Sequence, residues 1–345
     1  MEKFVKPPEV PPEKVGSIIS EAVLGIKKFS VLLSAYRLGF FEYLKKPLSI
    51  EEVSDKTNIS PRLTELMLKA LEKMELVERK GKKYKNTEIS TAYLTKDSFY
   101  NMENTISWME WKIKTWMSLE DRLRGLPMKG EETPDFTEII RVMAEECVCG
   151  HLQETVRVVS SYREFHKAKK LLDLGGGHGM YAIAFSMINP ELKCFVFDLP
   201  HVVKETEKYI KKYGAKNVHT IQGDFFRDEP GTDYDIVFSS FHPGGKNPEV
   251  ARKIARALKR GGLYFNKQCF HPDNDPRDSL EEILEDMEWN FSTFRPGKGE
   301  KIYTFKGDLS LKEYKEHLRN LGFEILNVHS FNKMDRMLVA RKSGE

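Results

Sequence analysis

The 345-residue sequence lacks any apolar run long enough to cross a membrane. A transmembrane helix needs ~18 or more uncharged apolar residues, and the amino terminus also lacks the pattern of a signal peptide. We therefore expect a cytoplasmic protein without membrane contacts. The net charge is small too, because 55 basic and 52 acidic residues give a formal net charge of only +3. No polyanionic partner is implied by that balance.

Cysteine is also scarce, with four residues in the chain. Two of them, Cys147 and Cys149, lie close to His151 in sequence and together offer three soft metal ligands. A closed zinc site needs a further ligand, usually from a second pair, and the sequence lacks that pair. We therefore predict no metal site and expect these side chains to pack in a helix or to line a pocket.

The length and composition predict a globular protein with more than one domain. The chain is long enough for two hydrophobic cores, and its 40% hydrophobic and 31% charged residues are typical of globular proteins. From about residue 169, strand-like and helix-like segments alternate, which predicts an α/β domain with a parallel sheet and helices on both faces. Strands are predicted near 171–175, 193–198, 217–222, 233–240 and 262–268, with two closing strands at 323–328 and 336–340.

The stretch 171–179 is an apolar run that contains Asp173 and ends in closely spaced glycines. This pattern is typical of a buried strand that turns sharply into a helix, and ligands of open α/β sheets bind at such turns. The absent Cβ atoms of Gly175 and Gly177 let the backbone approach a ligand closely. Asp173 favours a cofactor with an amino-acid moiety, such as S-adenosylmethionine, because its carboxylate would accept the ammonium group and repel a pyrophosphate.

Two further acidic residues follow the next two predicted strands. Asp198 can accept hydrogen bonds from ribose hydroxyls, a feature that nicotinamide and S-adenosylmethionine sites share. Asp224 can accept a hydrogen bond from an adenine amino group, while the neighbouring ring of Phe225 covers the purine face. This third acidic strand end favours S-adenosylmethionine over a dinucleotide.

The three motifs at 173–179, 197–201 and 223–226 together resemble, in order and spacing, the cofactor site of the plant-type and hydroxyindole-type small-molecule O-methyltransferases. The resemblance implies a Rossmann-like class I methyltransferase domain that follows an all-helical or winged-helix dimerisation domain. It also implies S-adenosylmethionine as the cofactor and S-adenosylhomocysteine as its product. The cofactor-binding residues it implies are Asp173, Gly175, Gly177, Asp198, Leu199, Asp224, Phe225 and Ser239.

The amino-terminal part of the chain has the pattern of a winged helix. Four prolines in residues 1–13 favour an extended arm, and apolar residues at helical spacing over 16–44 predict one or two buried helices. Two short capped helices over 49–73 and a hairpin over 76–84 follow. The basic hairpin is compatible with DNA binding, but the second helix mixes acidic and basic residues, which is a poor pattern for phosphate contacts. The resemblance implies instead a dimerisation module, hence a homodimer that binds no nucleic acid.

The predicted domains are an arm at 1–13, a winged-helix dimerisation domain at 14–97, a helical connector at 98–166 and the methyltransferase domain at 167–345. By resemblance, the connector lines the pocket of the methyl acceptor. The residues expected there are Met143, Cys147 and His151, from a helix predicted at 136–160, and Met287, Trp289 and Asn290, from the helix after the fifth strand. An apolar slot with a polar contact suits an aromatic or polycyclic acceptor.

His242 is the candidate catalytic general base, because it follows the fourth strand on the side that faces the cofactor. In the resembled family the catalytic histidine lies at this position within a His-Asp-Trp segment, whereas Pro243, Gly244 and Gly245 follow it here. A base needs a partner that fixes its tautomer and its pKa. If His242 is not the base, the acceptor is expected to be a group that needs little proton removal, namely a thiol, an amine or an activated carbon.

The sequence therefore predicts a homodimeric S-adenosylmethionine-dependent methyltransferase that acts on a small acceptor, at a hydroxyl oxygen. N-, S- and C-methylation stay open within that prediction. Two alternatives from other classes also stay open: a winged-helix DNA-binding regulator that senses S-adenosylmethionine, and a nucleic-acid methyltransferase. The lack of an Asn-Pro-Pro-Tyr-like tetrapeptide after the fourth strand argues against the latter.

Overall fold

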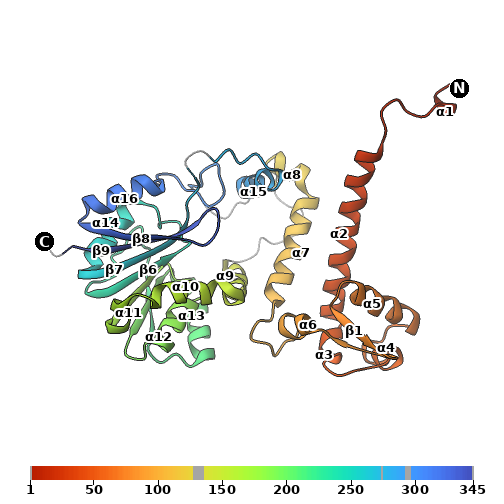
Figure 1. Cartoon of the computed structure of the whole chain (residues 1–345), viewed down its shortest axis with the longest axis horizontal. Coiled ribbons are helices and arrows are strands. Elements are labelled where there is room, and N and C mark those ends of the chain that lie inside the picture. Colours follow the sequence, from red (N-terminus) through yellow and green to blue (C-terminus); the bar gives the residue numbers. More distant parts are fainter. Residues whose placement is uncertain (1, 127–135, 273–274, 292–296, 344–345) are drawn as a thin grey trace. The chain divides into compact units, whose positions relative to one another are not determined.

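The structure is a computed structural model that describes residues 2–126, 136–272, 275–291 and 297–343. The chain divides into two compact units, Met1–Ser107 and Trp108–Glu345, both visible in Figure 1. The boundary between the units lies inside helix α7 (Glu103–Met117). The domain boundaries after residues 97 and 166 stay predictions.

The first unit is a helical domain with a small hairpin, as the sequence predicts. Ser49 and Glu52 form the expected capping box at the start of α4, in which each side chain bonds the other's backbone N–H. Phe40, Leu68 and Tyr84 are fully or almost fully buried in its core. The elements are α1 (Glu2–Val5), α2 (Glu13–Arg37), α3 (Phe40–Tyr43), α4 (Ile50–Thr57), α5 (Pro61–Lys73), β1 (Val77–Lys80), β2 (Lys83–Asn86) and α6 (Glu88–Tyr93).

Two sequence predictions for this unit need correction. The arm is not extended throughout, because a short helix precedes the prolines and α2 begins at Glu13, directly after the last of them. Helix α2 is also not buried: Ile18 and Ile19 are 58% and 59% exposed, and only Ala35 and Tyr36 in this helix are buried. The reason is that the core of the unit packs against the carboxyl-terminal half of α2 alone.

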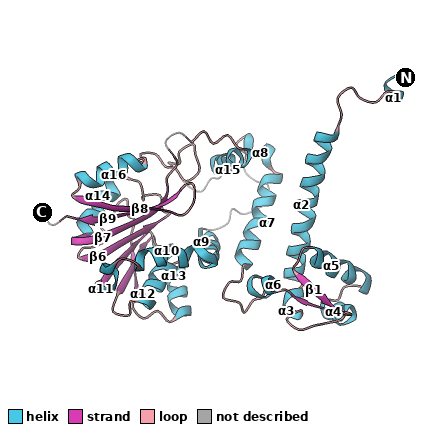
Figure 2. Ribbon diagram, in the orientation of Figure 1, coloured by secondary structure: helices cyan, strands magenta, loops and turns pink. Residues whose placement is uncertain are grey.

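The second unit is a three-layer α/β domain around one seven-stranded sheet (Figure 2). Leu171 and Leu172 belong to different buried clusters, as the alternation of side chains along a strand requires. Its helices besides α7 are α8 (Leu119–Leu123), α9 (Phe136–Glu146), the π-helical turn η1 (Cys147–His151), α10 (Leu152–Ser160), α11 (Arg163–Lys167), α12 (Met180–Ile188), α13 (Pro200–Tyr213), α14 (Pro248–Ala257), α15 (Leu280–Phe291) and α16 (Leu311–Asn320).

The sheet has the strand order β5-β4-β3-β6-β7-β9-β8. Its first five strands in the chain are parallel, and β9 pairs antiparallel with both β7 and β8, which confirms the predicted fold class. After β5 the chain returns to the other side of β3, so a switch point lies between β3 and β6, where open α/β sheets bind ligands. The strands are β3 (Lys170–Leu174), β4 (Lys193–Asp198), β5 (Val218–Gln222), β6 (Tyr234–Ser240), β7 (Leu258–Cys269), β8 (Phe323–Ser330) and β9 (Asp335–Lys342).

The continuous helix predicted over 136–160 is interrupted. Cys149 and Gly150 leave helical geometry within η1, and Gly150 has φ 133° and ψ −41°. Glycine tolerates such a positive φ because it has no Cβ atom. The resulting kink separates α9 from α10, and two residues of this turn, Cys147 and His151, line the cavity described next.

Candidate active site

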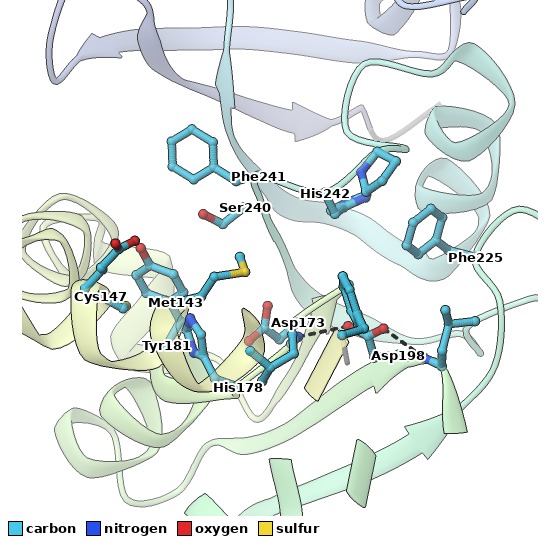
Figure 3. A pocket seen from close by; sticks show the side chains of 18 of the residues that line it. Met143, Cys147, Asp173, His178, Tyr181, Asp198, Phe225, Ser240, Phe241 and His242 are labelled. Atoms are coloured by element: carbon cyan, nitrogen blue, oxygen red, sulfur yellow. Dashed lines mark hydrogen bonds between the residues drawn. The ribbon is translucent and has the colours of Figure 1, made fainter. Parts of the chain in front are cut away.

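A cavity of about 650 Å³ lies at the carboxyl ends of β3, β4 and β6 in the second unit. Figure 3 shows Asp173 and Asp198 near these strand ends, Met143 and Tyr181 to one side and Phe225 to the other. The volume is in the range of pockets for small molecules and cofactors. The lining residues are Phe136, Ile140, Met143, Glu146, Cys147, His151, Asp173, Gly175, Gly176, Gly177, His178, Tyr181, Asp198, Leu199, His201, Phe225, Ser240, Phe241, His242, Pro243, Tyr303, Phe305 and Asp335.

The glycine turn after β3 forms the floor of one half of the cavity. Gly175 and Gly177 have φ of 66° and 53°, in the left-handed region that favours glycine. A Cβ atom at Gly176 would lie 2.6 Å from Cγ of Asp173. The turn therefore brings bare backbone to the cavity, and a side chain there would collide with the carboxylate.

Asp173 is a buried acid near the carboxyl end of β3. It is 1% exposed, and neither oxygen of its carboxylate has a hydrogen-bond partner among the described residues. Burial, with a smaller contribution from the charge of Asp198, raises the pKa of Asp173 to about 8. An unpaired buried carboxylate is costly, and a ligand ammonium group in the cavity would satisfy it.

The carboxylate of Asp198 is oriented by the backbone. Its oxygens accept hydrogen bonds from the N–H groups of Gly177, at 2.9 Å, and Leu199, at 2.8 Å, and Figure 3 draws hydrogen bonds at this position. Phe225 also lines the cavity. Asp224 does not appear among the described lining residues; its carboxylate accepts a hydrogen bond from the N–H of Phe226 at 2.9 Å.

His242 lies on the cavity wall with its ring against that of Phe225, at a centroid distance of 4.6 Å. Its Nε2 is 2.7 Å from Oγ of Ser239, and its Nδ1 accepts a hydrogen bond from the N–H of Gly244 at 3.1 Å. Ser239 is fully buried behind the ring and does not line the cavity. The roles predicted for His242 in catalysis and for Ser239 in cofactor binding stay predictions.

The other half of the cavity includes three of the predicted acceptor residues, Met143, Cys147 and His151. Burial raises the pKa of the Cys147 thiol to about 12, so the thiol is protonated near neutral pH. The remaining three predicted residues, all on α15, are outside the described lining: Met287, Trp289 and Asn290.

Two of these α15 residues instead hold the segment that follows the helix. The indole N–H of Trp289 donates to the carbonyl of Gly299 at 3.0 Å, and the amide of Asn290 donates to the carbonyl of Glu300 at 2.7 Å. The ring of Trp289 also contacts those of Tyr303 and Phe305, which line the cavity. Trp289 therefore supports the wall from behind.

Sequence reasoning missed Phe241 and Tyr303, whose aromatic rings line the cavity. The backbone φ of these residues is 47° and 56°. Such strained backbone is frequent at functional sites. Lys246 holds the Tyr303 loop, since its ammonium donates to the carbonyl of Tyr303 at 2.9 Å and pairs with Asp308 at 3.0 Å. Phe241 could have been found from its place at a strand end, whereas no local signal marks Tyr303.

The histidines inside the cofactor motifs, to which the sequence assigns no chemistry, also line the cavity. Burial lowers the pKa of His178 to about 4, so its ring is neutral near pH 7. Across the described part of the chain, no three His, Cys, Asp or Glu side chains are grouped so that they could hold a metal ion. Within the same residues, no helix is long and apolar enough to cross a membrane.

The sheet order, the left-handed glycine turn and the unpaired Asp173 define a Rossmann-type methyltransferase domain. The residues present fit S-adenosylmethionine. The cofactor carries an ammonium group that can pair with the carboxylate of Asp173, and the bare backbone of the glycine turn leaves room for the cofactor. This fit to S-adenosylmethionine agrees with the family comparison that follows.

The chain belongs to the S-adenosylmethionine-dependent O-methyltransferase family. Residues 139–300 match the O-methyltransferase domain, and residues 20–96 match the O-methyltransferase dimerisation domain. The chain is thus an enzyme, a small-molecule methyltransferase that depends on S-adenosylmethionine.

The relatives and solved structures below cover from 71% to 98% of the chain. An uncharacterized protein of Methanocaldococcus jannaschii is 45% identical, over 96% of this chain and 90% of its own length. Acetylserotonin O-methyltransferase of Macaca mulatta is 29% identical, over 71% of this chain and 77% of its own length. The structure of human N-acetylserotonin methyltransferase in complex with S-adenosylmethionine has a TM-score of 0.68 at 21% identity, and covers 98% of this chain and 100% of its own.

Proposed function

We propose that this enzyme transfers the methyl group of S-adenosylmethionine to a hydroxyl oxygen of a small aromatic or polycyclic acceptor. The observation that carries the proposal is that one cavity holds an unpaired buried carboxylate, Asp173, and an apolar wall that includes Met143, Phe241 and Tyr303. The first feature suits an amino-acid-bearing cofactor, and the second suits a flat apolar acceptor. The acetylserotonin O-methyltransferases, by their name, act on an acceptor of this kind.

The proposed cofactor residues follow from the same geometry. Asp173 accepts the ammonium group, the turn at Gly175 and Gly177 lies along the methionine part, and Asp198 receives the ribose hydroxyls. The ring of Phe225 covers the adenine. When bound, the cofactor supplies an electrophilic methyl group on a sulfonium, and the protein aligns the acceptor oxygen with it. Leu199 and Asp224 complete the proposed set.

The acceptor residues come from the other half of the cavity. Met143 lies on α9, and Cys147 and His151 lie on η1, the turn that is kinked at Gly150. The protonated thiol of Cys147 and the thioether of Met143 give this wall apolar surface, and His151 adds a polar side chain. The DNA-binding alternative gains nothing from the hairpin, where Lys85 pairs with Glu78 at 2.7 Å.

We also propose that the enzyme is a homodimer. The chain carries the family's dimerisation domain, and the amino-terminal half of α2 exposes apolar side chains that a partner would cover. Replacing Ile18 and Ile19 by Glu should convert a dimer into a monomer in size-exclusion chromatography with light scattering. The control is Ile89→Glu, which changes an equally exposed side chain on α6; a double variant that stays dimeric would refute the proposed interface.

The experiment that tests the function is incubation of the pure enzyme with methyl-labelled S-adenosylmethionine and an extract of the source cells. Label should appear in small organic molecules, and the labelled atom identifies O-, N-, S- or C-methylation. Label in nuclease-sensitive polymer, or none despite cofactor binding, would contradict the proposal.

A further inference from the structure

His242 is part of a closed circuit of hydrogen bonds. The N–H of Gly244 donates to Nδ1 of His242 at 3.1 Å, and Nε2 of His242 lies 2.7 Å from Oγ of Ser239. Ser239 donates to Oδ1 of Asn266 at 3.2 Å, and the amide nitrogen of Asn266 donates to the carbonyl of Gly245 at 2.7 Å. The circuit begins and ends on the turn that directly follows His242.

The hydrogen bond between Asn266 and Gly245 fixes which group donates and which accepts in the rest of the circuit. Only the NH₂ group of Asn266 can face the carbonyl of Gly245, so its oxygen faces Ser239 and accepts from that hydroxyl. Gln268 supports this orientation, because its amide nitrogen donates to the same oxygen at 3.1 Å. Because the hydroxyl hydrogen of Ser239 is donated to Asn266, Oγ of Ser239 can only accept a hydrogen bond from Nε2 of His242. The neutral imidazole is therefore the Nε2–H tautomer.

Both ring nitrogens of His242 are consequently engaged inside the protein. Nε2 already carries a hydrogen, and the lone pair of Nδ1 points at the backbone N–H of Gly244. A proton added at Nδ1 would bring two donors face to face. The other side chains in the circuit, Ser239, Asn266 and Gln268, are uncharged.

The surroundings hold the ring in this position. A Cβ atom at Gly175 would lie 2.8 Å from Cγ of His242, and the ring of Phe225 packs on the imidazole. The turn itself needs its glycines: a Cβ at Gly244 would lie 2.8 Å from the ring of Phe225, and one at Gly245 would lie 1.9 Å from Nε2 of Gln268. The Pro-Gly-Gly segment that replaces the Asp-Trp of the family pattern is thus the segment that closes the circuit.

We infer that His242 is a positioning residue and not the group that removes the acceptor's proton, because the Ser239–Asn266–Gly245 circuit locks its ring as a fixed wall between Gly175 and Phe225. This inference rests on the proposed function only in assuming that cofactor and acceptor share the cavity. It adds Asn266 and Gln268 as residues that set the shape of the cofactor half.

The inference also bears on the acceptor, which must react without losing a proton to His242. A phenol acidic enough to have lost its proton to water meets this requirement. Its oxygen lone pair forms the bond to the methyl carbon, the carbon–sulfur bond breaks, and its electron pair returns to sulfur to give the neutral thioether product. No proton is transferred to the enzyme in this step.

The tautomer of His242 tests the inference directly. We would label the full-length enzyme with ¹⁵N-histidine and record two-bond ¹H–¹⁵N correlations near pH 7, free and with S-adenosylhomocysteine, and assign His242 as the signal lost in His242→Gln. A single neutral Nε2–H tautomer in both states is expected. An Nδ1–H tautomer, an imidazolium or a mixture in wild type would overturn the inference. In Ser239→Ala the N–H of Gly244 still faces Nδ1, so the Nε2–H tautomer should persist, but the Nε2–H signal should shift because its acceptor is lost. An unchanged Nε2–H signal in that variant would refute the circuit.

Kinetics supply a second readout once an acceptor has been labelled. His242→Gln keeps an N–H donor toward Ser239 but has no basic nitrogen, so its KM for S-adenosylmethionine should rise while kcat falls less than about tenfold. Loss of a general base would instead lower kcat about 10²- to 10⁴-fold. If wild type labels no small molecule, the proposed function fails, and the tautomer still decides the role of His242.

Discussion

The two halves of the cavity are built in different ways. The cofactor half comes from turns that directly follow β3, β4 and β5, where a strand and the acid at or after its end are neighbours in sequence. The acceptor half comes from the continuous segment α9–η1, from the loop at Tyr303 and from the start of β9, three regions that are far apart in the chain. The first half is therefore encoded locally, and the second exists only after the tertiary structure has formed.

The halves also differ in chemistry. Asp173 and Asp198 give the cofactor half two carboxylates, whereas Met143, Phe241 and Tyr303 give the acceptor half apolar surface beside the polar side chains of Glu146, His151 and Asp335. Substitutions in the first half should change cofactor affinity, and substitutions in the second should change acceptor turnover. Two of the four experiments below test this separation, and the other two test the burial of one side chain in each half.

The largest effect is expected for Asp173→Asn. Loss of one partner of a buried ion pair costs about 3–5 kcal/mol, so the Kd for S-adenosylmethionine should rise at least ~100-fold in calorimetry. Asp335→Asn is the matched control, because Asp335 lines the cavity from β9; its Kd should stay within about threefold of wild type. Equal losses in the two variants would remove the distinction between the halves.

The stability of the free enzyme should depend on the same carboxylate. The native pKa of Asp173, about 8, lies above its value of 3.8 in an unfolded chain. Between these values the native state holds one more proton, so the free energy of unfolding falls as pH rises, by up to ~1.4 kcal/mol per pH unit from this group. Denaturant unfolding of wild type and Asp173→Asn should show that slope as the difference between them; parallel pH profiles would contradict the burial of an unpaired acid.

Two truncations should each impair a different quantity: one in the cofactor half should weaken cofactor binding, and one in the acceptor half should lower acceptor turnover. Phe225→Ala removes an aromatic face and should weaken cofactor binding about tenfold. Met143→Ala should leave the cofactor Kd within about threefold and lower kcat/KM for the labelled acceptor about tenfold, since it opens an apolar pocket. Calorimetry and initial rates on both variants give the comparison, and a cofactor defect in Met143→Ala would count against the assignment of α9 to the acceptor.

The smallest effect concerns the two cysteines near the kink. Cys147 is buried, and burial raises its thiol pKa to about 12, whereas Cys149 is exposed. Iodoacetamide near pH 7.5 should therefore modify Cys149 well before Cys147, because only the thiolate reacts. Peptide mass spectrometry over a time course measures both rates, and faster labelling of Cys147 would show an open wall with a reactive thiol.

The contrast between the halves also explains what the sequence could predict. The glycine turn, Asp173 and Asp198 could be predicted because strand, acid and turn are local patterns with a known place at the sheet edge. Trp289 could be placed on a helix, but whether that helix faces the cavity or supports the Tyr303 loop depends on contacts between distant segments.

Backbone conformation and missing partners account for the remaining errors. The kink at Gly150 needs a positive φ that a helical apolar pattern does not reveal. The apolar spacing in α2 predicts a buried helix, but the amino-terminal half of that helix is exposed in the single chain. The circuit around His242 joins residues 239 to 266, on two strands, and only the sheet register brings them together.

The most direct measurement for this account is a crystal structure of the enzyme with S-adenosylhomocysteine. The account predicts the ligand ammonium group within hydrogen-bond distance of Asp173, the ribose at Asp198 and the adenine against Phe225, with the space between Met143, Phe241 and Tyr303 left for the acceptor. A ligand that places its ammonium group at Glu146 or Asp335, with Asp173 still unpaired, would contradict the division of the cavity into a cofactor half and an acceptor half.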